Sequence, residues 1–293
     1  MAGMYAVYHG PIGLREISNS IHLKAVYLYQ KISKLGIEIK YSKFFDTITI
    51  ICDSKKLNKI ALSRNVNFCN LIINQISISV NEKTDHNDLD QIISILEEYS
   101  GQKSPNIKFP ETQMLDNVRE SEILSHPVFN SYHSETSLMR YIKSLENKDL
   151  SLTQSMISLG SCTMKLNAAS EMIPLSWTEW NSIHPFVPVD QARGYHEVIS
   201  KLETFLSEIT GFSATSLQPN SGAQGEYSGL MVIKSYLNKI GQSHRDICLI
   251  PSSAHGTNPA SAIMAGLKVV VIGTDDKGNI DIENLKIKVK EHK

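Results

Sequence analysis

Two polar turns, each directly after a short apolar run, carry the residues best suited to chemistry. Residues 218–225 read QPNSGAQG, and residues 252–259 read SSAHGTNP. Each turn precedes a stretch with helical spacing, so the first backbone N–H groups of each helix point outward without helical partners. Open α/β sheets hold ligands in turns of this kind, at the carboxyl ends of strands. The sequence therefore predicts one binding site built from both turns.

The first turn is suited to an anion. Gly222 and Gly225 lack a Cβ, so the backbone can approach a ligand closely or take a positive φ. The positive end of the helix dipole lies behind this turn, and a phosphate fits such a place. The spacing matches neither G-x-G-x-x-G nor G-x-x-x-x-G-K-[ST], which argues against a Rossmann dinucleotide site and a P-loop. An ordinary tight turn between strand and helix is the alternative.

The second turn contributes an imidazole, hydroxyls and an amide. His255 follows the strand predicted over 247–250, level with the predicted phosphate, where its ring could stack on a flat cofactor. A capping or hydrogen-bonded histidine is the simpler interpretation of a lone His. Thr257, Asn258 and Ser261 lie at the start of a short helix, and helix capping alone would account for them.

Composition narrows the class of protein. The chain has 293 residues, of which 41% are hydrophobic, and its net charge is −1. A buried core is therefore feasible, and the charge balance argues against strong attraction to nucleic acid or anionic lipid. No apolar run approaches the roughly 18 residues of a membrane helix, and residues 1–13 do not resemble a signal peptide. The four cysteines form no CxxC pair, so we expect reduced intracellular thiols and no metal site.

Hydrophobic spacing predicts the elements that position the two turns. In the first third, helices are expected over 1–8, 13–35, 54–64 and 87–99, and strands over 37–41, 48–52, 68–73 and 76–80. His9-Gly10-Pro11 breaks the first helix. A polar stretch with Pro105 and Pro110 follows. Beyond it, helices are expected over 135–145, 191–210 and 281–293, a long helix after residue 225, and strands over 214–217, 247–250 and 268–272.

Long stretches of the chain resemble one family. QPNSGAQGEYSGLMVI, IPSSAHGTNPASA and LENKDLSLTQSMISLGSCTMKLN are similar to the P-protein of the glycine cleavage system, as are MYAVYHGPIGLREI and FNSYHSET. The resemblance implies a pyridoxal-phosphate (PLP) enzyme of the aspartate-aminotransferase fold, fold type I. The expected class is α/β: a small α/β layer domain (1–101) ending the first half, a linker with an active-site loop (102–170), and the beginning of a fold type I large domain (171–293).

The resemblance also assigns roles to residues. It implies that Ser221, Gly222, Ala223 and Gln224 hold the cofactor phosphate, that His255 stacks on the ring and that Thr257 supports its polar edge. It places Ser161, Thr163 and Asn167 near the glycine carboxylate or the cofactor, with Cys162 in the same loop. His184 lies in an aromatic stretch that either packs or lines a channel for a lipoyl arm.

The expected activity is decarboxylation of glycine through PLP, with transfer of the aminomethyl group to the lipoyl arm of H-protein. Nothing places Lys165 opposite the phosphate turn, and the family's Schiff-base lysine is expected beyond Lys293. We therefore expect an internal fragment with no activity of its own, a dimer or paired halves, and a cytoplasmic or, in a eukaryote, mitochondrial location. Two alternatives remain: another fold type I enzyme, such as a hydroxymethyltransferase or amino-acid decarboxylase, or a non-catalytic structural or interaction half.

Overall fold

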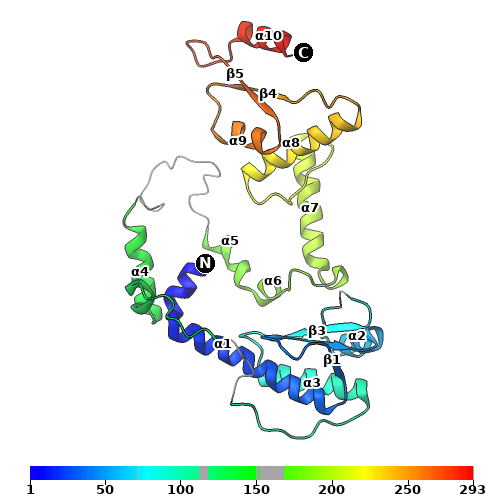
Figure 1. Ribbon diagram of the computed structural model, residues 1–293. Coiled ribbons are helices and arrows are strands. Elements are labelled where there is room, and N and C mark those ends of the chain that lie inside the picture. The colour runs from blue at the N-terminus through cyan, green and yellow to red at the C-terminus, as the bar shows by residue number, and fades with distance from the viewer. Residues whose placement is uncertain (71, 112–117, 150, 152–167, 293) are drawn as a thin grey trace. The chain divides into compact units, whose positions relative to one another are not determined.

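A computed structural model describes residues 1–70, 72–111, 118–149, 151 and 168–292 (Figure 1). The chain divides into two compact units, Met1–Ser151 and Leu152–Lys293. The first unit contains a three-stranded antiparallel sheet, and the second contains a two-stranded parallel sheet. Helices accompany both sheets. The predicted α/β class is confirmed.

The first helix, α1 (Ala2–Lys34), is broken where the sequence predicts. Gly10 has φ 61° and ψ −177°, which is not helical backbone, and Pro11 follows it. The two straight parts of α1 therefore meet at a kink. The helix ends at Leu35, and Gly36 takes the left-handed conformation with φ 68°.

Two further helices of the first unit begin at acidic caps. The Asp53 carboxylate accepts hydrogen bonds from the N–H groups of Lys55 and Lys56 at the start of α2 (Ser54–Ser63). Asp85 and Asp88 form a reciprocal capping box at the start of α3 (His86–Ser100). The left-handed residue Gly101 ends α3. Both helices lie where their patterns predict them.

The sheet of the first unit has the order β1-β2-β3. Its strands are β1 (Glu38–Ile39), β2 (Thr47–Ile51) and β3 (Gln75–Ser79), with Ile48 opposite Ile78 and Ile50 opposite Ile76. Alternate residues of β2 and β3 face the helices, and the resulting core contains side chains at most 1% exposed: Ala25, Leu28, Ile32, Ile48, Ile50, Leu57, Ala61, Ile76, Leu89, Ile95 and Leu96. Cys52 joins this core, and its burial raises the pKa of the thiol to about 11.

The strand predicted over 68–73 is wrong. Among its described residues, only Cys69 pairs, in an isolated bridge to Ser77. The Gln75 N–H donates to the Ile72 carbonyl, and Asn74 has φ 61°, so the chain turns tightly before β3. The apolar run was typical of a strand, but its backbone groups serve a turn.

The rest of the first unit returns to α1. The segment after α3 leads to a 3₁₀ turn, η1 (Pro127–Asn130), and to α4 (Glu135–Glu146), which begins at the cap Ser134. The His133 Nδ1 atom lies 2.8 Å from the Tyr8 carbonyl oxygen, beside the kink of α1. Lys31, almost fully buried, donates to the Pro105 carbonyl at 2.8 Å. These contacts fix both segments to the first helix.

The second unit contains a β-α-β crossover. Strand β4 (Ile247–Pro251) pairs in parallel with β5 (Lys268–Ile272), and α9 (Thr257–Met264) connects them. The remaining described elements of this unit are α5 (Ala169–Met172), η2 (Ile173–Ser176), α6 (Thr178–Asn181), η3 (Val189–Gln191), α7 (Arg193–Thr210), α8 (Gly222–Lys239) and α10 (Ile282–Glu291). The predicted helix end at Gly211 and helix start at Asp281 are confirmed.

The strand predicted over 214–217 is wrong. These residues form no strand, and the Leu217 N–H donates to the Glu203 carboxylate rather than to a neighbouring strand. The neighbour of β4 among the described strands is β5. In β5, Val271 is 59% exposed and Ile272 alone is buried.

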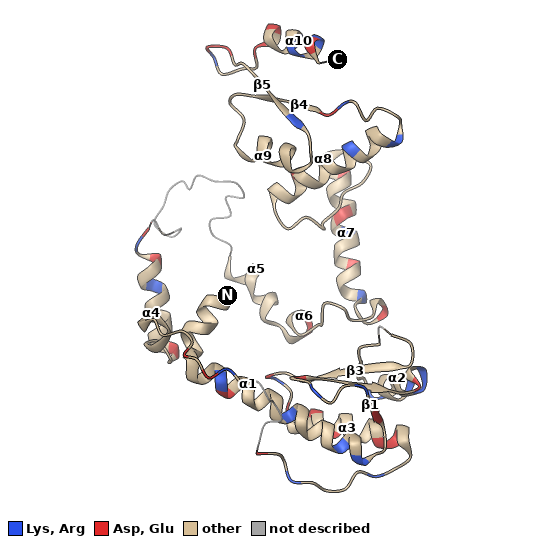
Figure 2. Ribbon diagram, in the orientation of Figure 1, with Lys and Arg blue, Asp and Glu red and all other residues tan. Residues whose placement is uncertain are grey.

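The second unit exposes much apolar surface in its described residues. No residue of α7 is buried, although Leu202, Phe205 and Ile209 follow one another at helical spacing. Acidic and basic residues are interspersed along both units (Figure 2). None of the helices in the described ranges is long and apolar enough to cross a membrane. The apolar faces of this unit are therefore suited to contacts with other protein surfaces.

Candidate functional site

The start of α8 is an ordered turn. The Ser221 hydroxyl accepts a hydrogen bond from the Gln224 N–H at 3.2 Å, and the Gln224 side-chain oxygen accepts from the Asn220 N–H at 2.7 Å. These two hydrogen bonds hold the turn in place. Helix geometry leaves the N–H groups of Gly222 and Ala223 without intrahelical acceptors, next to the positive end of the helix dipole. The turn thus offers fixed donors to an anion.

The glycines of this turn have open space beside them and no unusual backbone angles. Neither Gly222 nor Gly225 has a positive φ, and a Cβ at either position would meet no atom within 4 Å. Of the two reasons for glycine that the sequence suggests, only close approach by a ligand fits this geometry.

The second turn holds His255 by local hydrogen bonds. The His255 Nδ1 atom accepts from the Thr257 N–H at 3.1 Å and lies 2.7 Å from the Thr257 hydroxyl oxygen. Both contacts hold the ring against the first residue of α9. The residue is exposed. His255 is therefore hydrogen-bonded locally, as the simpler interpretation expects.

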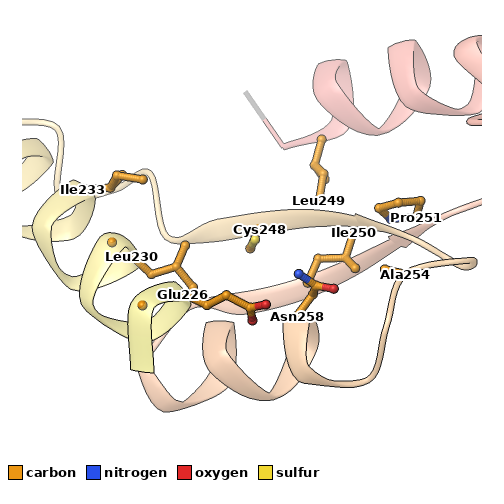
Figure 3. Close-up of a pocket in the computed structure, with 11 residues that line it drawn as sticks. Glu226, Leu230, Ile233, Cys248, Leu249, Ile250, Pro251, Ala254 and Asn258 are labelled. Atoms are coloured by element: carbon orange, nitrogen blue, oxygen red, sulfur yellow. The ribbon is translucent and has the colours of Figure 1, made fainter. Parts of the chain in front are cut away.

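A cavity of about 530 Å³ lies between α8, strand β4 and the turn that follows β4 (Figure 3). It is lined from α8 by Gly225, Glu226, Gly229, Leu230 and Ile233, from β4 by residues 248–251, and from the following turn by Ala254 and Asn258. Gly225 directly follows Gln224, while Ala254 and Asn258 lie on either side of His255 and Thr257. None of the predicted cofactor residues lines the cavity, but Gln224, His255 and Thr257 are next in sequence to residues that do.

Helix α9 is joined to α8 at the cavity. The hydroxyl of Ser261, which is 3% exposed, donates to Glu226 Oε2 at 3.1 Å. Further along, the Lys234 ammonium donates to the carbonyl oxygens of Ala265 and Gly266 at 2.8 and 3.1 Å. Burial raises the pKa of the Cys248 thiol, which lines the cavity as a neutral, weakly polar group.

The other predicted site residues lie apart from this cavity or outside the described residues. Ser161, Cys162, Thr163, Lys165 and Asn167 fall outside the part of the chain that the structure describes. His184 is exposed and does not line the cavity.

Local contacts fix the region around His184. Its Nδ1 atom accepts from the Phe186 N–H at 3.1 Å. Phe186 is 90% exposed, whereas the Trp180 and Tyr195 rings lie edge to face with centroids 4.8 Å apart. Packing therefore accounts for Trp180 but not for Phe186.

Sequence reasoning missed Glu226, the carboxylate at the cavity wall. A signal was present in the helical spacing. Gly225, Gly229 and Ile233 are four residues apart, as are Glu226 and Leu230, so these residues share one face of α8. That face includes a charged residue among small and apolar ones.

Fold and site together define an α/β chain with a ligand-sized cavity between a helix and the strand of a parallel crossover. Comparison with known proteins gives its relatives. Residues 1–96 match the family model for the glycine cleavage system P-protein. The whole chain is 56% identical over 296 residues to glycine dehydrogenase (decarboxylating) of Christiangramia forsetii. It is 49% identical over 304 residues to the mitochondrial enzyme of that name from Dictyostelium discoideum.

The chain spans about 31% of the length of each of these relatives and is itself covered completely. The relatives match far beyond the five quoted stretches, through both units. The resemblance to the glycine cleavage system P-protein that the motifs indicate is confirmed.

Proposed function

We propose that this chain is a section of a PLP-dependent glycine dehydrogenase (decarboxylating). The observation that carries the proposal is the cavity flanked by the two turns, in a chain 46–56% identical along its length to proteins of that name. Its volume lies within the range of small-molecule sites, about 300–1,000 Å³. Its apolar lining and the adjoining helix start suit a flat ring that bears a phosphate.

In this proposal each of the two turns binds a different part of PLP. The N–H groups of Gly222, Ala223 and Gln224 and the Ser221 hydroxyl bind the phosphate. His255 lies against the ring, and Thr257 holds the imidazole by its two contacts to Nδ1. When bound, PLP supplies an electron sink for decarboxylation of an amino acid. The protein's own part is to fix the phosphate and to orient the ring.

The substrate-facing part of the proposal involves residues from other segments. Ser161, Thr163 and Asn167, with Cys162 in the same loop, contact the glycine carboxylate or the cofactor. The stretch around His184 borders the path of the lipoyl arm of H-protein, which receives the aminomethyl group.

The proposed organisation keeps the domains expected from sequence: 1–101, 102–170 and 171–293. The exposed apolar faces of α7 and α8 are then covered by other parts of the longer protein, in paired halves or a dimer. The relatives' names include a mitochondrial enzyme and bacterial ones, so the proposed location is the mitochondrion in a eukaryote and the cytoplasm in a bacterium. Those names favour glycine decarboxylation over the alternatives of a hydroxymethyltransferase or a non-catalytic half.

The test has two parts. The folded chain is titrated with PLP and followed by induced circular dichroism, with Ser221→Ala and His255→Ala as variants. We expect binding that each substitution weakens about tenfold, since each removes one fixed contact. The longer protein that contains the chain is then assayed for glycine-dependent exchange of labelled bicarbonate with lipoylated H-protein. Absence of PLP binding by the folded chain, or of exchange by the longer protein, would contradict the proposal.

A further inference from the structure

We propose that Glu226 is a positioning residue that sets the spacing between the two turns. The inference rests on the proposed function, because it concerns how the phosphate turn and the histidine turn come to share one ligand. Glu226 lies in the second turn of α8, shortly after the phosphate turn, and reaches across to α9, which directly follows the histidine turn.

The contact that carries the inference is between a half-buried carboxylate and a buried hydroxyl. Glu226 Oε2 lies 3.1 Å from the hydroxyl oxygen of Ser261, which is only 3% exposed. A buried hydroxyl without a partner costs about 1–3 kcal/mol, so this pair strongly favours one arrangement of the helices. Figure 3 shows the Glu226 carboxylate and the Asn258 amide directed toward one another from the two helices. Both residues line the cavity.

Two side-chain bridges of the described residues join α8 to α9. Lys234 binds the carbonyl groups at the carboxyl end of α9, far from the histidine turn. Glu226 binds Ser261, on the side of α9 nearer to that turn. With both bridges in place, α9 is held at two points along α8. Loss of the Glu226 bridge leaves the Lys234 bridge and the packing of α9 but removes the polar contact nearest the histidine turn, so that turn is held less tightly relative to the phosphate turn.

A direct role for Glu226 in holding the ligand is disfavoured by its charge. A carboxylate near an anion site opposes binding of the anion. The hydroxyl of Ser261 engages the Oε2 atom toward α9. The chemistry thus assigns Glu226 to the spacing of the two turns rather than to contact with the phosphate.

The inference predicts a specific pattern of affinities. Glu226→Ala and Ser261→Ala each weaken binding about five- to tenfold, since each breaks the same bridge. The double variant Glu226→Ala with Ser261→Ala is no weaker than either single variant. Glu226→Gln keeps an oxygen that accepts from Ser261, so its affinity stays within about twofold of the wild type. Ser228→Ala, an exposed position on α8, is the matched control and changes nothing.

The experiment uses the full 293-residue chain and pyridoxamine 5′-phosphate as the probe. This probe has no aldehyde, so it forms no imine with lysine, and its affinity reports only non-covalent binding at the two turns. Calorimetric titration gives the affinity, and far-UV circular dichroism with thermal unfolding verifies each fold. Amide hydrogen exchange of residues 252–258 is measured without the probe. We expect faster exchange in the two alanine variants and unchanged exchange in Glu226→Gln and Ser228→Ala.

The outcomes separate the two proposals. If the wild type binds the probe and the alanine variants bind equally well, the positioning role is overturned and the proposed function stands. If the folded wild type does not bind, the proposed function is contradicted, and the exchange pattern alone decides the positioning role. A loss of affinity in Glu226→Gln as large as in Glu226→Ala also overturns the inference, because it shows that charge rather than the bridge matters.

Discussion

Gly10 shows how a single residue can determine the path of a long helix. Its φ of 61° is strained for any residue with a Cβ, and that atom would lie 2.5 Å from His133 Cε1 and 2.7 Å from the Phe129 carbonyl oxygen. The kink of α1 therefore provides the place into which the 129–133 segment packs. Glycine here serves both a backbone angle and a close approach.

We predict that Gly10→Ala destabilises the first unit by about 2 kcal/mol or more, because it combines a strained φ with two close contacts. Urea unfolding monitored by circular dichroism measures the change. Gly3→Ala is the control, since Gly3 lies in the same helix with open space around it. That substitution should raise the free energy of unfolding by about 0.5–1 kcal/mol through the higher helix propensity of alanine. Equal effects of both substitutions would contradict the role of Gly10.

Glu97 makes the first unit sensitive to acid. The Lys103 ammonium binds Glu97 Oε2 at 2.7 Å, and the Ser104 N–H and hydroxyl both bind Oε1 at 2.9 Å. These contacts lower the pKa of the Glu97 carboxyl to about 2. A lowered pKa means that this contribution to stability is present above the ordinary value of 4.5 and is lost as the pH falls toward 2.

We therefore predict that Glu97→Gln flattens the dependence of stability on pH between about 5 and 2. The variant is less stable than the wild type at neutral pH, and the two converge in acid. Urea midpoints measured across this range give the comparison, with the exposed Glu120→Gln as control. A constant difference between wild type and Glu97→Gln down to pH 2 is the contrary result.

At the scale of elements, helix ends were the most predictable feature. Asp53, Ser134, Gly101 and Gly211 act within one turn of their own position, so their effect can be derived from local sequence. The two failed strands show the limit of local reasoning. Residues 68–73 and 214–217 have strand-like composition, but a strand also needs a partner at the right distance, and that depends on distant chain segments.

The candidate site was predictable to a similar degree. Both turns, their helices and strand β4 followed from local pattern. The order of strands around the site did not, and neither did the Glu226–Ser261 bridge, which joins residues 35 positions apart. The charged residue on an otherwise small and apolar helix face was the one local sign of that bridge.

The contribution of the Asp53 cap to the stability of α2 can be tested directly. We predict that Asp53→Ala destabilises the chain by about 1 kcal/mol, because the N–H groups of Lys55 and Lys56 lose their acceptor. The Asp53 N–H keeps its bond to the Tyr99 hydroxyl, so the substitution affects the side chain alone. Urea unfolding measures the loss. Lys55→Ala, which keeps the cap, should change stability by less than about 0.5 kcal/mol.

At the scale of the whole molecule, the two units differ in how they are stabilised. The first has a continuous core under its sheet, whereas the described residues of the second bury few side chains. Burial of apolar area is the main stabilising term for a domain. We therefore expect the first unit to be the more stable part of this chain.

The two tryptophans make this difference measurable, because Trp177 and Trp180 both belong to the second unit. Leu28→Ala removes a fully buried side chain of the first unit and should cost it about 2–5 kcal/mol. We predict that this substitution lowers the urea midpoint seen by circular dichroism and leaves the tryptophan fluorescence transition unchanged. Leu62→Ala, at an exposed position on α2, is the control. A parallel shift of both signals would show that the units unfold together.

Residues 103–109 dock onto the first unit. Lys103, Ser104 and Pro105 are held by side chains of α3 and α1, and the Phe109 ring lies 5.2 Å from that of Tyr27. The folded unit therefore does not stop at the glycine that ends α3. A truncation at Gly101 would remove the hydrogen-bond partners of the Glu97 carboxylate and the Lys31 ammonium.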